Sequence, residues 1–228
     1  MKGFAGFRSL LALAIVASVV SRRASGAPDP GLVWKLDDPR AIAGVAAEVL
    51  GGPRIEGPAG GRYAVFNGRS DGFILPAAPL AGWKEFTVEV WFRPDADGPA
   101  AQRFVHLEDE TGRRLTLETR MVGGQWALDT SLTDGSNKQS LLDVARLHPS
   151  DRWYWAALRY DGKTMTSFVN GRKELAGPVT FPPMVAGHIG IGVRMNKVYW
   201  FKGAIRELRF HPSALPDQDL AGLDYPPM

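Results

Sequence analysis

Tryptophan, arginine, histidine and glutamate side chains in strand-like parts of the sequence supply chemistry suited to sugar binding. Sugar rings present apolar faces that stack on tryptophan, and charged side chains hydrogen-bond the sugar hydroxyls. The candidate ligand-binding residues on this ground are Trp91, Arg93, His106, Glu118, Arg120, Trp153, Trp155 and Arg194. The alternative is that Trp153 and Trp155 lie beneath loops and extend the core, because tryptophans are heavily buried on average.

Two glutamates raise the alternative of a glycan-cleaving enzyme, either a hydrolase or a lyase. Retaining glycosidases need two carboxyl groups roughly 5 Å apart on either side of the scissile bond. Glu89 and Glu118 satisfy this only if their strands are neighbours. Each has an arginine at strand spacing, Arg93 and Arg120, which favours ionised structural pairs. We therefore name no catalytic residue and keep the enzyme as an alternative.

The remaining chemistry-bearing residue types form no recognisable reactive site. The histidines do not show the clustered spacing of zinc ligands, and only His106 is kept as a site candidate. The sequence contains no nucleophile elbow and no phosphate-binding glycine loop. It also contains no cysteine, which excludes disulfides and thiol chemistry.

The first 26 residues have the pattern of an export signal. Lys2 and Arg8 precede the apolar run 10–20, and the small residues 24–26 follow as a cleavage site. The run is shorter than the ~18 residues of a membrane span, so we expect a secreted or periplasmic protein with no membrane span after cleavage. We therefore divide the chain into a signal at 1–26 and a single domain at 27–228.

Removal of the signal changes the charge of the protein. The signal holds four of the 27 basic residues and none of the 24 acidic ones, so the rest has 23 against 24, a net charge of −1. Nucleic-acid binding is not expected, because it requires an excess of positive charge. The oligomeric state is left open.

Alternating apolar and polar runs separated by turn residues predict an all-β protein. The clearest signal lies at 153–171, where Asp161-Gly162 and Asn170-Gly171 close two successive runs as tight turns. Regular spacing of the runs predicts a jelly-roll sandwich of two antiparallel sheets, with at most short helices near the termini. The stretch 41–50 is interpreted as a helical turn or a loop, and 213–223 as a short closing helix. Other strands are predicted at 32–36, 63–66, 73–75, 86–93, 103–108, 114–120, 125–133, 139–143, 188–194 and 199–210.

Strand alternation assigns the faces of three of these runs. In 86–93 the apolar side chains at 86, 88, 90 and 92 face inward, so Glu89, Trp91 and Arg93 face outward. The same alternation turns Glu118 and Arg120 outward in 114–120. It also turns Trp153, Trp155 and Arg159 outward in the run that begins at 153. Three strands therefore have a charged and aromatic outer face, and the pattern does not say whether they share a sheet.

Four segments in this order resemble the bacterial laminin-G-like domains of the concanavalin A-like lectin/glucanase superfamily. They are Ala64-Val65-Phe66-Asn67-Gly68 with Asp71-Gly72-Phe73-Ile74, the strand 86–94, the hairpin 153–171, and the strand 201–210 with Ala214-Leu215. The resemblance implies a two-sheet jelly roll, usually extracellular, that often binds carbohydrate or another protein. It also implies calcium in some members, but Arg206 stands where a carboxylate is frequent and Asn67 where aspartate is frequent. Asp37, Asp38 and Asp71 remain candidate calcium ligands, and no cofactor is expected to be required.

These observations favour a secreted, non-catalytic module that binds carbohydrate or a protein surface through the outer face of one sheet. A structural or adhesion module of an envelope assembly is the third hypothesis, beside the binding module and the enzyme.

Overall fold

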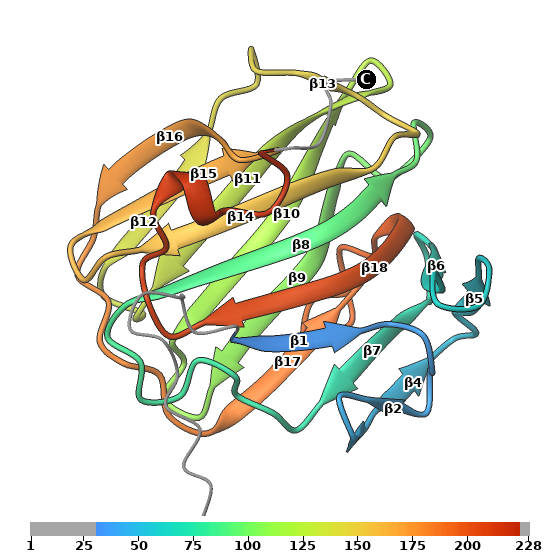
Figure 1. The fold of residues 1–228 in the computed structure, drawn as a ribbon, viewed down its shortest axis with the longest axis horizontal. Coiled ribbons are helices and arrows are strands. Elements are labelled where there is room, and N and C mark those ends of the chain that lie inside the picture. Colours follow the sequence, from blue (N-terminus) through green and yellow to red (C-terminus); the bar gives the residue numbers. More distant parts are fainter. Residues whose placement is uncertain (1–30, 224–228) are drawn as a thin grey trace, which may run out of the picture.

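The computed structural model describes residues 31–223 as two antiparallel β-sheets packed face to face (Figure 1). The predicted export signal at 1–26 lies outside the described residues. Among the described residues the one helical element is a 3₁₀ turn at Asp217–Asp219. The all-β fold class predicted from alternation is therefore confirmed.

The first sheet contains the hairpin predicted at 153–171 and the last strand in the sequence. Its order is β16 (Arg172–Pro178), β15 (Thr164–Val169), β14 (Tyr154–Tyr160), β8 (Phe86–Pro94), β18 (Lys202–His211), β6 (Tyr63–Asn67) and β5 (Arg54–Glu56), and β1 (Leu32–Lys35) pairs with β18. Asn170 and Gly171 both have positive φ, as the tight turn between β15 and β16 requires.

The second sheet lies behind the first in Figure 1. Its order is β12 (Lys138–Leu142), β11 (Gln125–Thr133), β10 (Arg114–Val122), β9 (Ala101–Asp109), β17 (Gly187–Ile191), β7 (Gly72–Leu75) and β4 (Glu48–Leu50), and β13 (His148–Pro149) pairs with β11. Together with β10, strand β9 forms the centre of the candidate site described below.

The core lies between the sheets and is rich in aromatic rings. Phe92 of β8 stacks on Phe104 of β9 with ring centroids 4.3 Å apart, and it meets Trp126 of β11 edge-on at 5.1 Å. These contacts cross from one sheet to the other, and each of the three side chains is fully buried. The inward assignment of the apolar residues of β8 is thus correct.

Residues 41–50 are not a helical turn or a loop. They form β2 (Ala41–Ile42), β3 (Val45–Ala46) and β4, of which β2 and β3 make a small hairpin and β4 pairs with β7. Ala43 and Gly44 have positive φ, which allows the reversal between β2 and β3. Pairing with a distant strand decides the structure of a segment that local sequence leaves ambiguous.

Two predicted strands are shorter than expected, and the closing helix is reduced to a single turn. Strand β17 ends at Ile191, and β18 begins at Lys202, so Arg194 and Tyr199 lie in the loop between them. Tyr199 has a φ of +56°, a left-handed conformation that does not fit a strand.

Candidate functional site

The structure divides the eight candidate residues between the two sheets. Trp91 and Arg93 lie on β8, Trp155 lies on β14, and Trp153 directly precedes β14 in the first sheet. In the second sheet, His106 lies on β9, Glu118 and Arg120 lie on β10, and Arg194 follows β17. The sequence left open whether these strands share a sheet, and the structure separates them: β8 and β14 belong to one sheet and β9 and β10 to the other.

Trp155 is covered and belongs to the packed structure. Only 6% of its surface is exposed, and its ring stacks on that of Trp91 at a centroid distance of 5.5 Å. Gly222 lies directly over it, because a Cβ at this glycine would stand 2.9 Å from the Cβ of Trp155. Figure 1 shows this C-terminal segment crossing in front of β14 and β15. The alternative that Trp155 extends the core is therefore the correct one.

Trp153 and Trp91 form a half-buried aromatic cluster at the other end of the same face. Trp153 meets Trp91 edge-on at 5.8 Å and Tyr63 at 5.1 Å. The guanidinium groups of Arg93 and Arg206 lie over the rings of Trp153 and Trp91, at 5.8 and 4.3 Å. One face of each of these two rings is thus covered by one of the protein's own arginines.

Glu89 is bound by the C-terminal segment rather than open to a ligand. It is 1% exposed, accepts a hydrogen bond from the amide of Ala221 at 2.6 Å, and lies 3.0 Å from Nε2 of His211. Glu118 lies on the outer face of the opposite sheet. Packed sheets stand about 10 Å apart and these side chains point away from each other, so the pair is too far apart for the ~5 Å of a retaining glycosidase.

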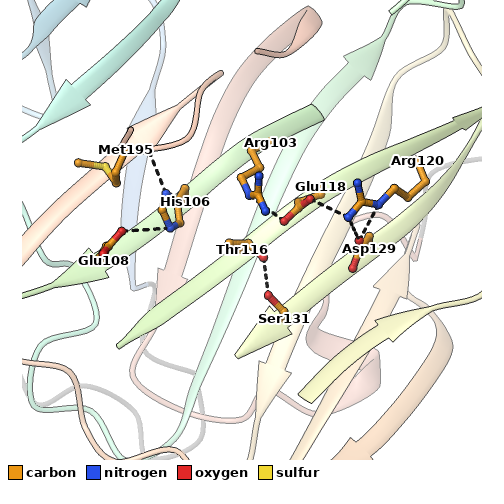
Figure 2. Close-up of polar contacts among 9 residues, drawn as sticks. All are labelled: Arg103, His106, Glu108, Thr116, Glu118, Arg120, Asp129, Ser131 and Met195. Carbon is orange, nitrogen blue, oxygen red and sulfur yellow. Dashed lines mark hydrogen bonds and ion pairs between the residues drawn. The ribbon is translucent and has the colours of Figure 1, made fainter. Parts of the chain in front are cut away.

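Glu118 instead anchors an ion-pair network on the second sheet (Figure 2). Its Oε1 lies 2.8 Å from Nε of Arg103, and its Oε2 lies 3.2 Å from Nη2 of Arg120. Arg120 also reaches Asp129 on β11, with Nη2 2.6 Å from Oδ2. Burial raises the pKa of Glu118 above its usual value, against the opposing effect of the charge on Arg103. Two arginines beside the carboxylate give this network a structural role.

A β-bulge brings Arg103 and His106 to the same face of β9. The register of β9 against β10 skips one residue, so that Leu117 faces Val105 and Glu118 faces Arg103. Phe104 is the extra residue and points into the core. Without this bulge, side-chain alternation would place Arg103 and His106 on opposite faces.

A cationic pocket of about 260 Å³ opens on this outer face of the second sheet, beside the ion-pair network. Its main lining residues are Arg103, His106, Arg114, Thr116, Ser131 and Arg194. The hydroxyl oxygens of Thr116 and Ser131 are 2.6 Å apart, as drawn in Figure 2. Of the predicted ligand residues, the pocket therefore brings together His106 and Arg194. Sequence reasoning missed its other members, since threonines and serines on strands are common and the bulge hides Arg103.

His106 is held in its neutral form with a defined tautomer. Burial, together with the charges of Arg103, Arg194 and Arg114, lowers its pKa to about 3. The amide of Met195 donates to Nδ1 at 3.0 Å, so the single ring proton is on Nε2. This Nε2 lies 3.6 Å from Oε2 of Glu108 and has no hydrogen-bond partner among residues 31–223. The ring thus offers a donor within the pocket.

We expect His106 to make the protein less stable in mild acid. The unfolded histidine, with a pKa near 6.5, gains a proton as the pH falls, whereas the native histidine does not gain it until pH about 3. Between pH 6 and pH 5 the native protein should lose about 1 kcal/mol of unfolding free energy through this group. His106→Asn, which keeps an acceptor for the Met195 amide, should remove that part of the pH dependence in urea unfolding.

His188→Asn is the matched control, because His188 is exposed on β17. The unfolding free energy of this variant should change with pH as that of the wild type does. An unchanged pH dependence in His106→Asn would contradict the burial of a neutral imidazole.

The candidate calcium ligands do not form a suitable cluster. The carboxylate of Asp71 accepts the amide hydrogens of Gly52 and Asn67 at 3.0 and 3.1 Å, and Asp38 pairs with Arg40. No group of three or more histidine, cysteine, aspartate or glutamate residues within 31–223 is arranged to hold a metal ion. Asp71 and Asp38 are thus engaged by backbone amides and an arginine within the described part of the chain.

Comparisons with known proteins identify the family to which this fold belongs. A family model described as the concanavalin A-like lectin/glucanases superfamily, from the laminin G group, matches residues 67–221. A search of curated proteins returned no match. In the described part of the chain, no helix has the length and apolar character needed to cross a membrane.

Solved structures similar to this one include three that contain sugars. Domain 4 of AbnA, a GH43 extracellular arabinanase from Geobacillus stearothermophilus in complex with arabinotriose, is 20% identical, with a TM-score of 0.62 over 83% of this chain and 94% of that chain. The Ruminococcus gnavus IT-sialidase CBM40 bound to α2,3 sialyllactose is 19% identical, with a TM-score of 0.57 over 69% and 94%.

The third is the ligand-binding domain of botulinum neurotoxin serotype D in complex with N-acetylneuraminic acid. It is 14% identical with a TM-score of 0.59, and the match covers 83% of this chain and 49% of that one. At these identities the three structures establish a shared fold. The family model, in contrast, matches more than half of the chain. The protein therefore belongs to the concanavalin A-like lectin/glucanase superfamily, as its sequence motifs indicated.

Proposed function

We propose that the protein is an exported, non-catalytic carbohydrate-binding module whose ligand occupies the cationic pocket on the second sheet. The observation that carries this proposal is the convergence of His106, Arg103 and Arg114 on one hollow, each with a buried N–H group that has no hydrogen-bond partner among the described residues. Buried donors without acceptors are costly, and sugar hydroxyl and carboxylate oxygens are suitable acceptors.

Two further observations support the proposal. The similar structures include carbohydrate complexes of domains with this fold. The export pattern at 1–26 agrees with a ligand outside the cytoplasm. The separation of Glu89 from Glu118 favours binding over cleavage by that pair.

The experiment is a glycan array with two variants that test the two sheets separately. Ser131→Phe should fill the pocket with a ring and reduce glycan affinity at least about tenfold, because a pocket of this size holds only a small group. Trp153→Ala removes the half-buried ring of the first sheet and should leave glycan affinity within about twofold. Melting temperatures of both variants establish that they are folded.

The opposite pattern, with binding lost in Trp153→Ala and kept in Ser131→Phe, would move the site to the first sheet. Capture of a protein partner that sugar does not displace would favour the structural or adhesion role. Release of reducing ends from a bound glycan would favour the enzyme.

A further inference from the structure

The cationic pocket carries positive charge that the protein does not neutralise. Of its arginines, Arg103 has the carboxylate of Glu118 as a partner. Arg114 and Arg194, together with Lys138 at the rim, have no carboxylate within ion-pair distance in the part of the chain that the structure describes. Three cations around one small hollow repel each other, and an anion would relieve that repulsion.

The lining residues of the same pocket supply three buried donors that have no hydrogen-bond partner within 31–223, and an anionic acceptor would suit them. These donors are Nε2 of His106, Nη1 of Arg103 and Nε of Arg114, and all three atoms are buried. His106 is 1% exposed and lines the pocket. Hydrogen bonds to a charged acceptor are about twice as strong as neutral ones, and guanidinium groups match the two oxygens of a carboxylate.

A second hollow, of about 370 Å³, adjoins the first and adds carboxylates to its lining. It shares Arg114 and Arg194 with the cationic pocket, and its other lining residues include the carboxylates of Glu108 and Glu110 beside His188, Met195 and Asn196. Carboxylates accept hydrogen bonds from sugar hydroxyls and repel a second anion. The face thus has one end suited to an anion and one end suited to a neutral sugar.

We infer that the ligand of this face is an acidic glycan, with the carboxylate of one sugar in the cationic pocket and a neutral sugar in the adjoining hollow. This inference rests on the proposed function and adds the class of glycan. The Arg103, Arg114 and Arg194 side chains bind the carboxylate, and the neutral His106 ring donates from Nε2.

The test compares each acidic glycan with its own methyl ester, which has nearly the same shape but no charge. The probes are α2,3-sialyllactose and a galacturonic acid trisaccharide, with their methyl esters and a sulfated disaccharide, all measured by isothermal titration calorimetry. At least one acid should bind ten times or more tightly than its ester, and its affinity should fall as salt is raised.

Arg194→Ala and Lys138→Ala should each remove most of this preference for the acid. Arg172→Ala is the matched control, because Arg172 is exposed on β16 of the other sheet. Lys138 is exposed, so its variant stays informative if Arg194→Ala does not fold.

The outcomes separate this inference from the proposed function. If neutral sugars bind in the cationic pocket and esterification does not change the affinity, the binding module stands and the acidic ligand is wrong. If only the sulfated probe binds, the anion site stands but the carboxylate assignment is wrong. If none of the probes binds, the acidic ligand is wrong, and the binding module is overturned as well if no glycan of the array binds.

Discussion

Replacement of Glu118 by alanine is expected to lower the free energy of unfolding by about 3–5 kcal/mol, the usual cost of breaking a buried ion pair. Glu118 is 3% exposed and is bound by Arg103 at 2.8 Å and by Arg120 at 3.2 Å. Its removal leaves the largely buried Arg103 without a carboxylate. Equilibrium unfolding in urea measures this loss of unfolding free energy. The dependence of the free energy on urea concentration should be the same in the variant and the wild type.

Glu110→Ala is the matched control, because Glu110 is exposed at the end of β9 and should change stability by less than about 0.5 kcal/mol. Glu118→Gln keeps the shape but not the charge and should resemble the alanine variant. If Glu118→Ala lowers the free energy of unfolding by less than about 1 kcal/mol, the ion pair of Glu118 is screened by water, as surface ion pairs are. A stable Glu118→Gln variant that stops glycan cleavage would instead support the enzyme.

Replacement of Trp155 by alanine is expected to cost about 3–5 kcal/mol of stability, as for other large aromatic residues removed from a core. The ring packs on Trp91, and the guanidinium of Arg209 lies 4.6 Å from its centre. The C-terminal segment that covers it would lose its contact at Gly222. Glycan affinity, measured at a temperature where the variant is folded, should stay within about twofold of the wild type.

Val144→Ala serves as the control for this prediction, since Val144 is 55% exposed and should lose little stability. A Trp155→Ala protein of normal stability that no longer binds glycan would contradict the packing role. It would also return the ligand site to the first sheet.

Much of the fold was predictable because it depends on local patterns. The turns at Asp161-Gly162 and Asn170-Gly171 and the alternation of β8 predict the hairpin and the buried face, and the structure confirms both. The residues 41–50 were not predictable in this way. Their strands exist because of pairing partners, of which β7 is distant in sequence.

The candidate site was predictable only in part. His106 and Arg194 were identified from residue type, and both line the cationic pocket. Trp155 was wrongly chosen as a ligand-binding residue. Alternation shows on which face of a sheet a side chain lies, but it does not show whether another segment covers that face. Here residues 213–223 cover it, through contacts such as the hydrogen bond from Arg159 to the carbonyl oxygen of Leu215 at 2.7 Å.

The sequence by itself determined the strands, their turns and their inward faces, because these follow from side-chain alternation and from residues that tolerate positive φ. Only the tertiary structure decided which outer face is open. The assignment of β8 and β10 to different sheets separates Glu89 from Glu118, and the bulge at Phe104 brings Arg103 beside His106. Sheet order arises from contacts between segments that are distant in sequence, and the bulge is a register shift between β9 and β10 that side-chain alternation does not reveal.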